Sequence, residues 1–155
     1  MKPPTGLDSS SGNSEITQQL RTWWKQHRQG RVFDSNAGFF LPDGSSLSPD
    51  GDYATSDPLQ GLSSRSAGHF GRFAPAFVIE LLSATDSLSE ARDKMESWLC
   101  NGVLLGWLID PYRRNVWVYE KGRKPRLETG DRVAGSGPVD GFVLESRDLW
   151  REFED

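Results

Sequence analysis

The chain has 155 residues, of which 35% are hydrophobic and 26% charged, and this is enough for one globular domain with a single buried core. Its net charge of −4 is unlike that of a typical nucleic-acid-binding domain, although basic residues can still gather on one face. The single Cys100 excludes an internal disulfide and a cysteine-based metal cage, and no run approaches the ~20 apolar residues of a membrane span.

The first predicted elements are a flexible N-terminal segment and a helix. Residues 1–13 are rich in Pro, Gly and Ser, so we expect them to be flexible. They also lack the apolar run of a signal peptide, which predicts a cytoplasmic protein. From Ser14 to Gln29 apolar residues recur at helical spacing, and Gly30 is suited to a left-handed helix end.

Short strands and a long loop are predicted next. Residues 31–34 and 38–41 are expected to form two short strands joined by a turn. Ser48-Pro49-Asp50 then begins another extended piece. Residues 56–75 show little periodicity and are predicted to form a long loop, and loops of that length in a compact domain tend to be functional or disordered.

The most informative run is Phe77-Val78-Ile79-Glu80-Leu81-Leu82. Five of its six residues are large and apolar, which predicts a central strand covered on both faces. Ser87 and Glu90 form a capping box, so a helix is expected from Leu88 to about Asn101. Cys100 lies on the apolar-patterned end of that helix and is predicted to be a small core residue.

The last third of the chain is predicted to return to strands. Residues 104–109 form a buried strand, which pairs as a hairpin with the alternating residues 115–120. Weak strands near 126–127 and 142–144 and a short helix over 147–153 follow. The order of helices and strands predicts an α/β domain with a mixed sheet.

Glu80 breaks the apolar pattern of its strand. A carboxylate inside a doubly covered strand is costly unless a cation or hydrogen bonds compensate its charge. Either Glu80 lies at the strand's end and meets a surface arginine, or it is a metal ligand or catalytic carboxylate. Asp50 and Lys94 favour the second reading, because Lys94 lies at the edge of its helix's apolar stripe and can reach the strand below. Taken singly, Asp50 is an ordinary turn residue and Lys94 an ordinary solvated one.

A series of short segments follows the same order as in a known family. The segments are Pro3-Pro4-Thr5-Gly6, Arg31-Val32-Phe33-Asp34-Ser35, Gly38-Phe39, Leu41-Pro42, Ser48-Pro49-Asp50, Phe77-Val78-Ile79-Glu80-Leu81, Lys94-Met95, Asn101-Gly102-Val103 and Gly106-Trp107-Leu108-Ile109-Asp110-Pro111. Together they resemble the bacterial putative restriction endonuclease family of the PD-(D/E)XK nuclease superfamily. The resemblance extends from about Pro3 to Trp150.

This resemblance implies a restriction-endonuclease-like core, in which a central mixed β-sheet is flanked by helices and carries a metal site at one end. Residues 14–155 would form this single nuclease-like domain. Asp50 matches the family's first acid and Glu80 its second. The lysine usually found two residues after the second acid is replaced by Leu82, and Lys94 on the next helix matches the migrated lysine.

The implied activity is a Mg²⁺-dependent DNA endonuclease that hydrolyses phosphodiester bonds, with Mn²⁺ as the alternative metal. Asp50 and Glu80 would be the metal ligands, and Lys94 would orient the attacking water or stabilise the transition state. The alternative is a catalytically inactive nuclease-fold module that acts in binding or interaction.

Three departures from the family pattern bear on that choice, and one of them is the loop over residues 56–75. Ala76 stands where the family usually has Asp. Family members also carry a further N-terminal segment ahead of the match at Pro3, which predicts a truncated copy or a late start codon and argues against a competent enzyme.

DNA contacts are predicted for a cluster of basic residues on the later hairpin. The cluster comprises Arg113, Arg114, Lys121, Arg123, Lys124 and Arg126. It could bind phosphates without sequence preference, or simply be a solvated hairpin edge kept soluble by its charges. A homodimer would suit the cutting of two strands, but the sequence shows no interface.

Overall fold

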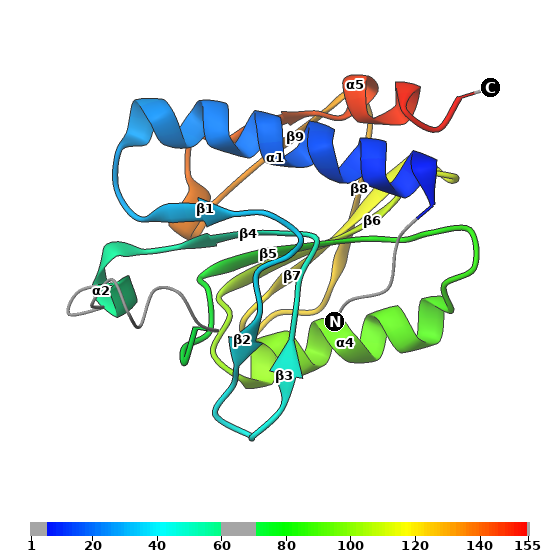
Figure 1. Cartoon of the computed structure of the whole chain (residues 1–155). Helices are drawn as coiled ribbons and strands as arrows, with labels where there is room; N and C mark the ends of the chain where they lie inside the picture. Colours follow the sequence, from blue (N-terminus) through cyan, green and yellow to red (C-terminus); the bar gives the residue numbers. More distant parts are fainter. Residues whose placement is uncertain (1–5, 60–70, 155) are drawn as a thin grey trace.

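The computed structural model describes residues 6–59 and 71–154, and it consists of a sheet between two helical layers (Figure 1). The elements are α1 (Leu7–His27), β1 (Arg31–Phe33), β2 (Phe39–Phe40), β3 (Ser46–Leu47), β4 (Gly51–Ala54), α2 (Ser56–Leu59), β5 (Phe77–Leu81), α4 (Leu88–Cys100), β6 (Leu105–Asp110), β7 (Asn115–Glu120), β8 (Arg126–Thr129), β9 (Arg132–Ala134), a 3₁₀ turn (Gly137–Val139), β10 (Val143–Glu145) and α5 (Ser146–Arg151).

The central sheet has the strand order β1-β4-β5-β6-β7-β8. Only β5 and β6 are parallel, and α4 makes the crossover between them. The other neighbours are antiparallel, and β2–β3 and β9–β10 form two small separate pairs. The predicted mixed sheet flanked by helices is therefore confirmed.

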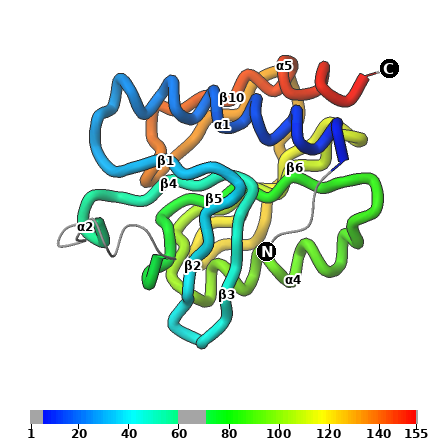
Figure 2. Tube along the Cα trace, viewed as in Figure 1, coloured from blue at the N-terminus to red at the C-terminus, as the bar shows by residue number. Residues whose placement is uncertain are grey.

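The strand β5 separates two apolar cores, because its successive side chains point to opposite faces. Phe77 and Ile79 join the core beneath α1, to which the C-terminal elements also contribute. Val78 joins the core beneath α4, with Met95 and Trp98. Figure 2 shows that α5 runs beside α1, so the two ends of the described chain cover the same face of the sheet. Glu80 shares the α4 face with Val78, which is where its partners lie.

The long helix begins earlier than predicted, at Leu7 instead of Ser14, so the expected flexible segment is helical from that residue on. Residues 1–5 lie outside the described part of the chain. The early start rests on tertiary packing: a Cβ at Gly12 would lie 2.8–2.9 Å from atoms of Leu81 and Phe153. Packing of this kind supports a helix whose own composition gives little sign of one. The helix also ends earlier, because Arg28 (φ +63°) and not Gly30 is its left-handed cap.

Several smaller expectations are corrected. Cys100 is exposed and not in the core, because it is the last residue of α4 and has rotated off the buried stripe. α2 occupies the start of the predicted loop 56–75, and residues 60–70 lie outside the described part. β2 pairs with β3 and not with β1. β9 lacked a clear pattern and is stabilised by pairing with β10. Among the described helices, none is long and apolar enough to cross a membrane.

Asp52 in β4 is a buried acid whose carboxyl oxygens have no hydrogen-bond partner among the described residues. Burial raises its pKa well above the ordinary 3.8, and the nearby charge of Asp34 adds to this. Because folding raises the pKa of this carboxyl, its ionisation destabilises the folded state. The native state is therefore most stable below the pKa that Asp52 has in the unfolded chain, and it loses stability as the pH rises above that value.

We therefore expect Asp52→Asn to be more stable than the wild type at pH 8, and this advantage to shrink towards pH 4. Urea unfolding at pH 4.5 and pH 8 measures the difference. A variant whose stability follows that of the wild type at both pH values would contradict the buried, unpaired state of Asp52.

Candidate active site

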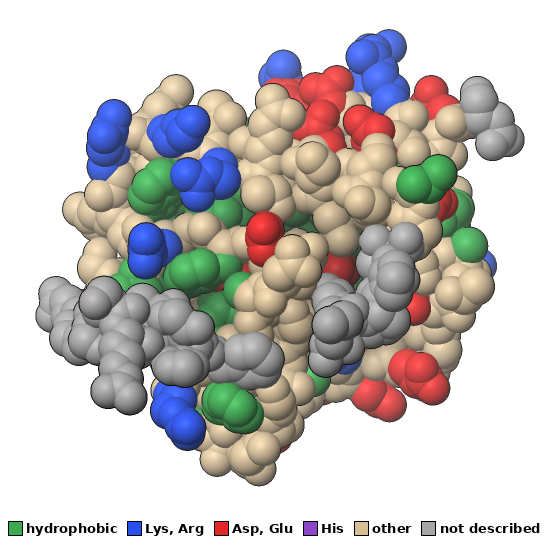
Figure 3. Space-filling model, in the orientation of Figure 1, with side chains coloured by type: hydrophobic (Ala, Val, Ile, Leu, Met, Phe, Trp, Pro, Cys, Tyr) green, Lys and Arg blue, Asp and Glu red, His purple; other side chains and the backbone are tan. Residues whose placement is uncertain are grey.

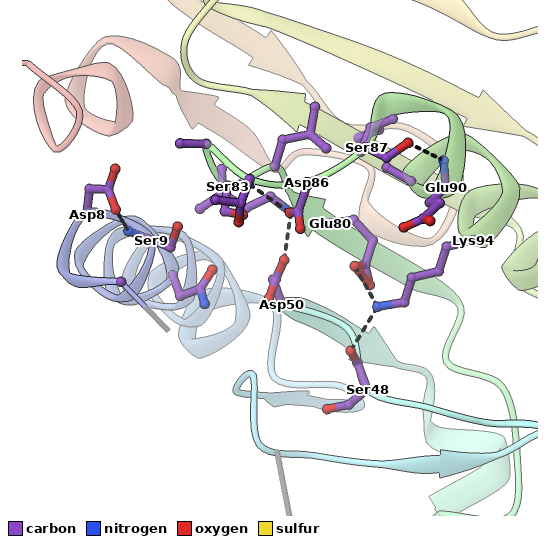
Figure 4. A pocket seen from close by; sticks show the side chains of 18 residues that line it. Asp8, Ser9, Ser48, Asp50, Glu80, Ser83, Asp86, Ser87, Glu90 and Lys94 are labelled. Carbon is purple, nitrogen blue, oxygen red and sulfur yellow. Dashed lines mark hydrogen bonds and ion pairs between the residues drawn. The ribbon is translucent and has the colours of Figure 1, made fainter. Parts of the chain in front are cut away.

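A cavity of about 720 Å³ opens where β5 ends. Its walls are the first two turns of α1, the connection over residues 82–87 and the first half of α4 (Figure 4). Asp50, Glu80 and Lys94 all line it, although they come from three different elements. Three further acids, Asp8, Asp86 and Glu90, also line the cavity, so its charge is strongly negative.

The antiparallel pairing of β4 with β5 brings the two predicted acids together. Gly51 lies opposite Ile79 in the register, which places Asp50 beside Glu80 at the pocket end of the sheet. The Leu81 amide donates to Asp50 Oδ2 at 2.7 Å, and the Asp50 amide donates to the Ile79 carbonyl at 3.0 Å. The first bond fixes the carboxylate of Asp50, and the second fixes its backbone at the end of the β4–β5 pair.

Lys94 lies where the helical pattern placed it, with its ammonium beside Glu80. The Lys94 Nζ and Glu80 Oε2 atoms are 2.9 Å apart, and Nζ also donates to the Ser48 carbonyl at 3.3 Å (Figure 4). The other oxygen of Glu80 accepts a hydrogen bond from Trp98 Nε1 at 3.4 Å. Glu80 is thus held by two groups of α4, and α4 is itself capped by the predicted hydrogen bond from the Glu90 amide to the Ser87 hydroxyl.

The environment of Glu80 is unfavourable for its negative charge. Burial raises its pKa to about 7, and the neighbouring charge of Asp50 also raises it, while Lys94 and Trp98 act in the opposite direction. The side chain of Glu80 is 9% exposed, whereas that of Lys94 is 33% exposed. The ammonium therefore reaches Glu80 from the solvent side and compensates only part of the local negative charge.

The donor set fits a hard divalent cation. Asp50 and Glu80 supply carboxylate oxygens, and Mg²⁺ is commonly held by one or two carboxylates while it keeps several waters. Within residues 6–59 and 71–154, no group of three or more His, Cys, Asp or Glu side chains forms a closed metal cage. Asp50 and Glu80 would therefore leave positions on such a cation open to water and substrate.

The structure divides the predicted basic cluster. Arg113 and Arg114 lie in the turn after β6, at the same end of the sheet as Glu80, where Arg113 pairs with Asp110 and Arg114 with Glu154. Lys121, Arg123, Lys124 and Arg126 lie in or next to the β7–β8 turn, at the opposite end. There, Arg123 and Arg126 both pair with Glu120.

Some residues of the cavity were not found from the sequence. Ser9 and Asn13 of α1 line it and are 6% and 8% exposed. The Ser9 Oγ and Asn13 Oδ1 atoms have no hydrogen-bond partner among the described residues. The sequence offered no signal for them, because they fall in the segment predicted to be flexible. Trp98 also has a role that its apolar pattern did not indicate, because its indole N–H donates to Glu80.

Comparisons with known proteins agree with this architecture. The family model Uma2, described as a putative restriction endonuclease, matches residues 1–146. The chain is also similar to the crystal structure of a putative nuclease belonging to DUF820 from Anabaena variabilis, with a TM-score of 0.82 and 22% sequence identity. That alignment covers 99% of this chain and 86% of the other. No match was found among curated proteins.

Proposed function

The chain belongs to the Uma2 family of putative restriction endonucleases, and from this premise we propose that it is a Mg²⁺-dependent or Mn²⁺-dependent endonuclease that hydrolyses phosphodiester bonds in DNA. The observation that carries the proposal is the pairing of Glu80 with Lys94 beside Asp50 on the wall of the cavity. The family and the nuclease-like fold support nuclease chemistry in general. The choice of metal, the DNA substrate and the roles of individual residues belong to the proposal.

The ion pair has features that a purely structural pair does not need. A buried structural pair is best kept away from other charges of the same sign, because desolvation already opposes it. Here Asp50 places a second negative charge beside Glu80, and Lys94 remains one-third exposed and faces the cavity. Such a concentration of perturbed charge in a cavity is typical of functional sites.

Each residue has a distinct role in the proposed reaction. Asp50 and Glu80 would hold the cation, which when bound would supply polarisation of the phosphoryl oxygen and a lower pKa for a water molecule. The Leu81 amide fixes the rotamer of Asp50, and the Trp98 indole fixes one oxygen of Glu80. The Lys94 ammonium faces the same cavity and stabilises the charge that develops on the phosphate. Arg113 and Arg114, at this end of the sheet, are candidates for contacts with neighbouring phosphates.

Ala76, which stands where the family usually has Asp, lies away from Asp50, Glu80 and Lys94. Ala76 immediately precedes β5, at the end of the strand remote from the cavity, and its amide donates to the Tyr53 carbonyl. It is buried and does not line the cavity. The substitution is therefore compatible with an intact site.

Cleavage of supercoiled plasmid in Mg²⁺ or Mn²⁺ tests the proposal, with Asp50→Ala and Lys94→Ala as the variants. We expect the wild type to nick the plasmid, and each variant to lose at least 100-fold in rate, since removing one such group commonly costs that much. Circular dichroism of each protein controls for folding. A folded wild type that does not nick DNA with either metal would contradict the nuclease proposal and favour the inactive binding module.

A further inference from the structure

The exposed side of α1 changes from neutral to basic along its length. Some of its exposed residues recur at intervals of three or four, and these lie on one side of the helix. From the N-terminal end they are Ser10, Ser14, Gln18, Arg21, Lys25 and Arg28, and Arg31 follows at the start of β1. We call this row of side chains the α1 stripe.

The second half of the stripe carries basic residues and no acid. Between Ile16 and Phe33 there are four Lys or Arg residues and no Asp or Glu, although the whole chain has a net charge of −4. Figure 3 shows Lys and Arg side chains gathered over the C-terminal half of α1 and over β1. No ion pair joins the Lys and Arg residues of the stripe to an acid of the described chain, and the Arg21 guanidinium lies over the Trp24 ring at 5.0 Å. The stripe therefore offers positive charge that no described acid neutralises.

The stripe is continuous with the active-site cavity. A second hollow of about 410 Å³ lies along α1, between the helix and the turn after β1. Its lining comprises Ser10, Asn13, Ser14, Thr17, Gln18, Asp34 and Ser35. Asn13 lines both hollows, and its buried Oδ1 has no hydrogen-bond partner among the described residues. A polar path thus leads from the cavity past Asn13 to the basic end of the helix.

The length and charge of the path fit a polyanionic chain. From Asn13 to Arg28 the helix advances about 22 Å, at 1.5 Å per residue, which spans several nucleotides. The active-site end carries acids that need a cation next to a phosphate, whereas the stripe can bind phosphates directly through lysine and arginine. The cavity would therefore carry out the reaction, and the stripe along α1 would bind the neighbouring phosphates.

We propose that the DNA strand whose phosphodiester enters the cavity runs along the α1 stripe, with its phosphates on Arg21, Lys25, Arg28 and Arg31 and with Asn13 contacting the nucleotide at the junction of the two hollows. The proposal rests on the proposed nuclease function for its substrate class. It assigns the main contribution to DNA affinity to α1 and not to the basic cluster predicted from the sequence. Four members of that cluster, Arg113, Arg114, Arg123 and Arg126, are already paired with acids.

Fluorescence anisotropy with a labelled 20-base-pair DNA duplex tests this assignment, in EDTA so that no cleavage takes place. The variant is Arg21→Gln/Lys25→Gln/Arg28→Gln in the full chain. The matched comparison is Lys121→Gln/Arg123→Gln/Lys124→Gln, which removes the same charge at the remote end of the sheet on the β7–β8 edge. All six residues are exposed, so both variants are expected to fold, and thermal unfolding verifies it.

We expect the α1 variant to bind at least tenfold more weakly than the wild type and to reduce the slope of log K against log [salt] by two to three, since each lost phosphate contact lowers the slope by about one. The comparison variant is expected to change affinity by less than twofold. Asn13→Ala is expected to weaken binding without altering the salt slope, because Asn13 carries no charge.

Equal losses in the two triple variants, a larger loss in the β7–β8 variant, or a wild type that does not bind the duplex would overturn the assignment. The outcome is independent of the cleavage assay. An α1 variant that loses binding in a protein that never nicks DNA would support the surface and reject the nuclease. If the wild type nicks DNA but the α1 variant binds DNA normally, the nuclease function would be supported and the α1 surface rejected.

Discussion

Glu80→Gln is expected to abolish metal binding and cleavage while leaving the fold intact. The substitution keeps the size of the side chain and its capacity to accept the hydrogen bond from Trp98, but it removes the charge that would hold the cation. Since burial and Asp50 already disfavour that charge in the metal-free protein, its removal should not lower stability and is expected to raise the melting temperature slightly. We expect cleavage to fall by at least 100-fold.

Calorimetric titration with Mn²⁺ and thermal unfolding with increasing Mg²⁺ measure the binding part of this prediction. A cation that binds only the folded protein raises the melting temperature with concentration, and the variant should lose that rise. Glu90→Gln is the matched control, because Glu90 is another carboxylate on the wall of the same cavity but is not among the proposed ligands. Unchanged metal affinity in Glu80→Gln, or an equal loss in Glu90→Gln, would show that the metal site is assigned to the wrong residues.

Gly30→Ala is expected to cause the largest loss of stability of any single methyl added to this chain at a described glycine. Gly30 has φ +72°, a conformation that L side chains rarely adopt, and it lies in the connection between α1 and β1. A Cβ there would lie 2.1 Å from the Ala54 carbonyl oxygen and 2.7 Å from Tyr53 Oη. The backbone strain and the steric overlap together should cost about 3–5 kcal/mol of the free energy of unfolding.

Gly44→Ala separates these two contributions. Gly44 has φ +89°, so the strain is comparable, but no atom lies within 4 Å of the added Cβ. Its expected cost is about 1–2 kcal/mol, from the backbone alone. Chemical denaturation of the two variants measures both values. Equal costs would mean that Gly30 does not approach β4 as closely as the structure shows, and the path of the chain at the basic end of α1 would need revision.

The mixed sheet and its crossover helix could be predicted because their signals are local. The run Phe77–Leu82 is apolar on both alternating sets, and the capping box from Ser87 to Glu90 marks the start of the next helix. The same pattern singled out Glu80, since a charge in a doubly covered strand requires a compensating partner. The helical period then pointed to Lys94, and the ion pair between the two is present.

Other parts of the site depend on contacts between residues far apart in the chain. Asp50 meets Glu80 through a strand register set by pairing across the sheet, and Leu81 donates to Asp50 over a separation of 31 residues. Asn13 lines the cavity because packing against Leu81 and Phe153 extends α1 backwards through a segment whose composition indicates flexibility. No local sequence pattern predicts the contact between Asp50 and Glu80 or the position of Asn13 on the cavity wall.

By itself, then, the sequence predicted the α/β architecture and the strand and helix beside the cavity, and it singled out Glu80 and Lys94 as candidates, to which the family resemblance added Asp50. Only the tertiary structure decided that α1 forms a wall of the cavity and that the basic hairpin cluster is split between two ends of the sheet. It also decided that a basic stripe, which pairs with no acid of the described residues, leads away from the cavity. The physical reason is the range of the interactions. Periodicity, capping and turn chemistry act over a few residues, whereas burial, register and the distribution of charge in space depend on the whole packed chain.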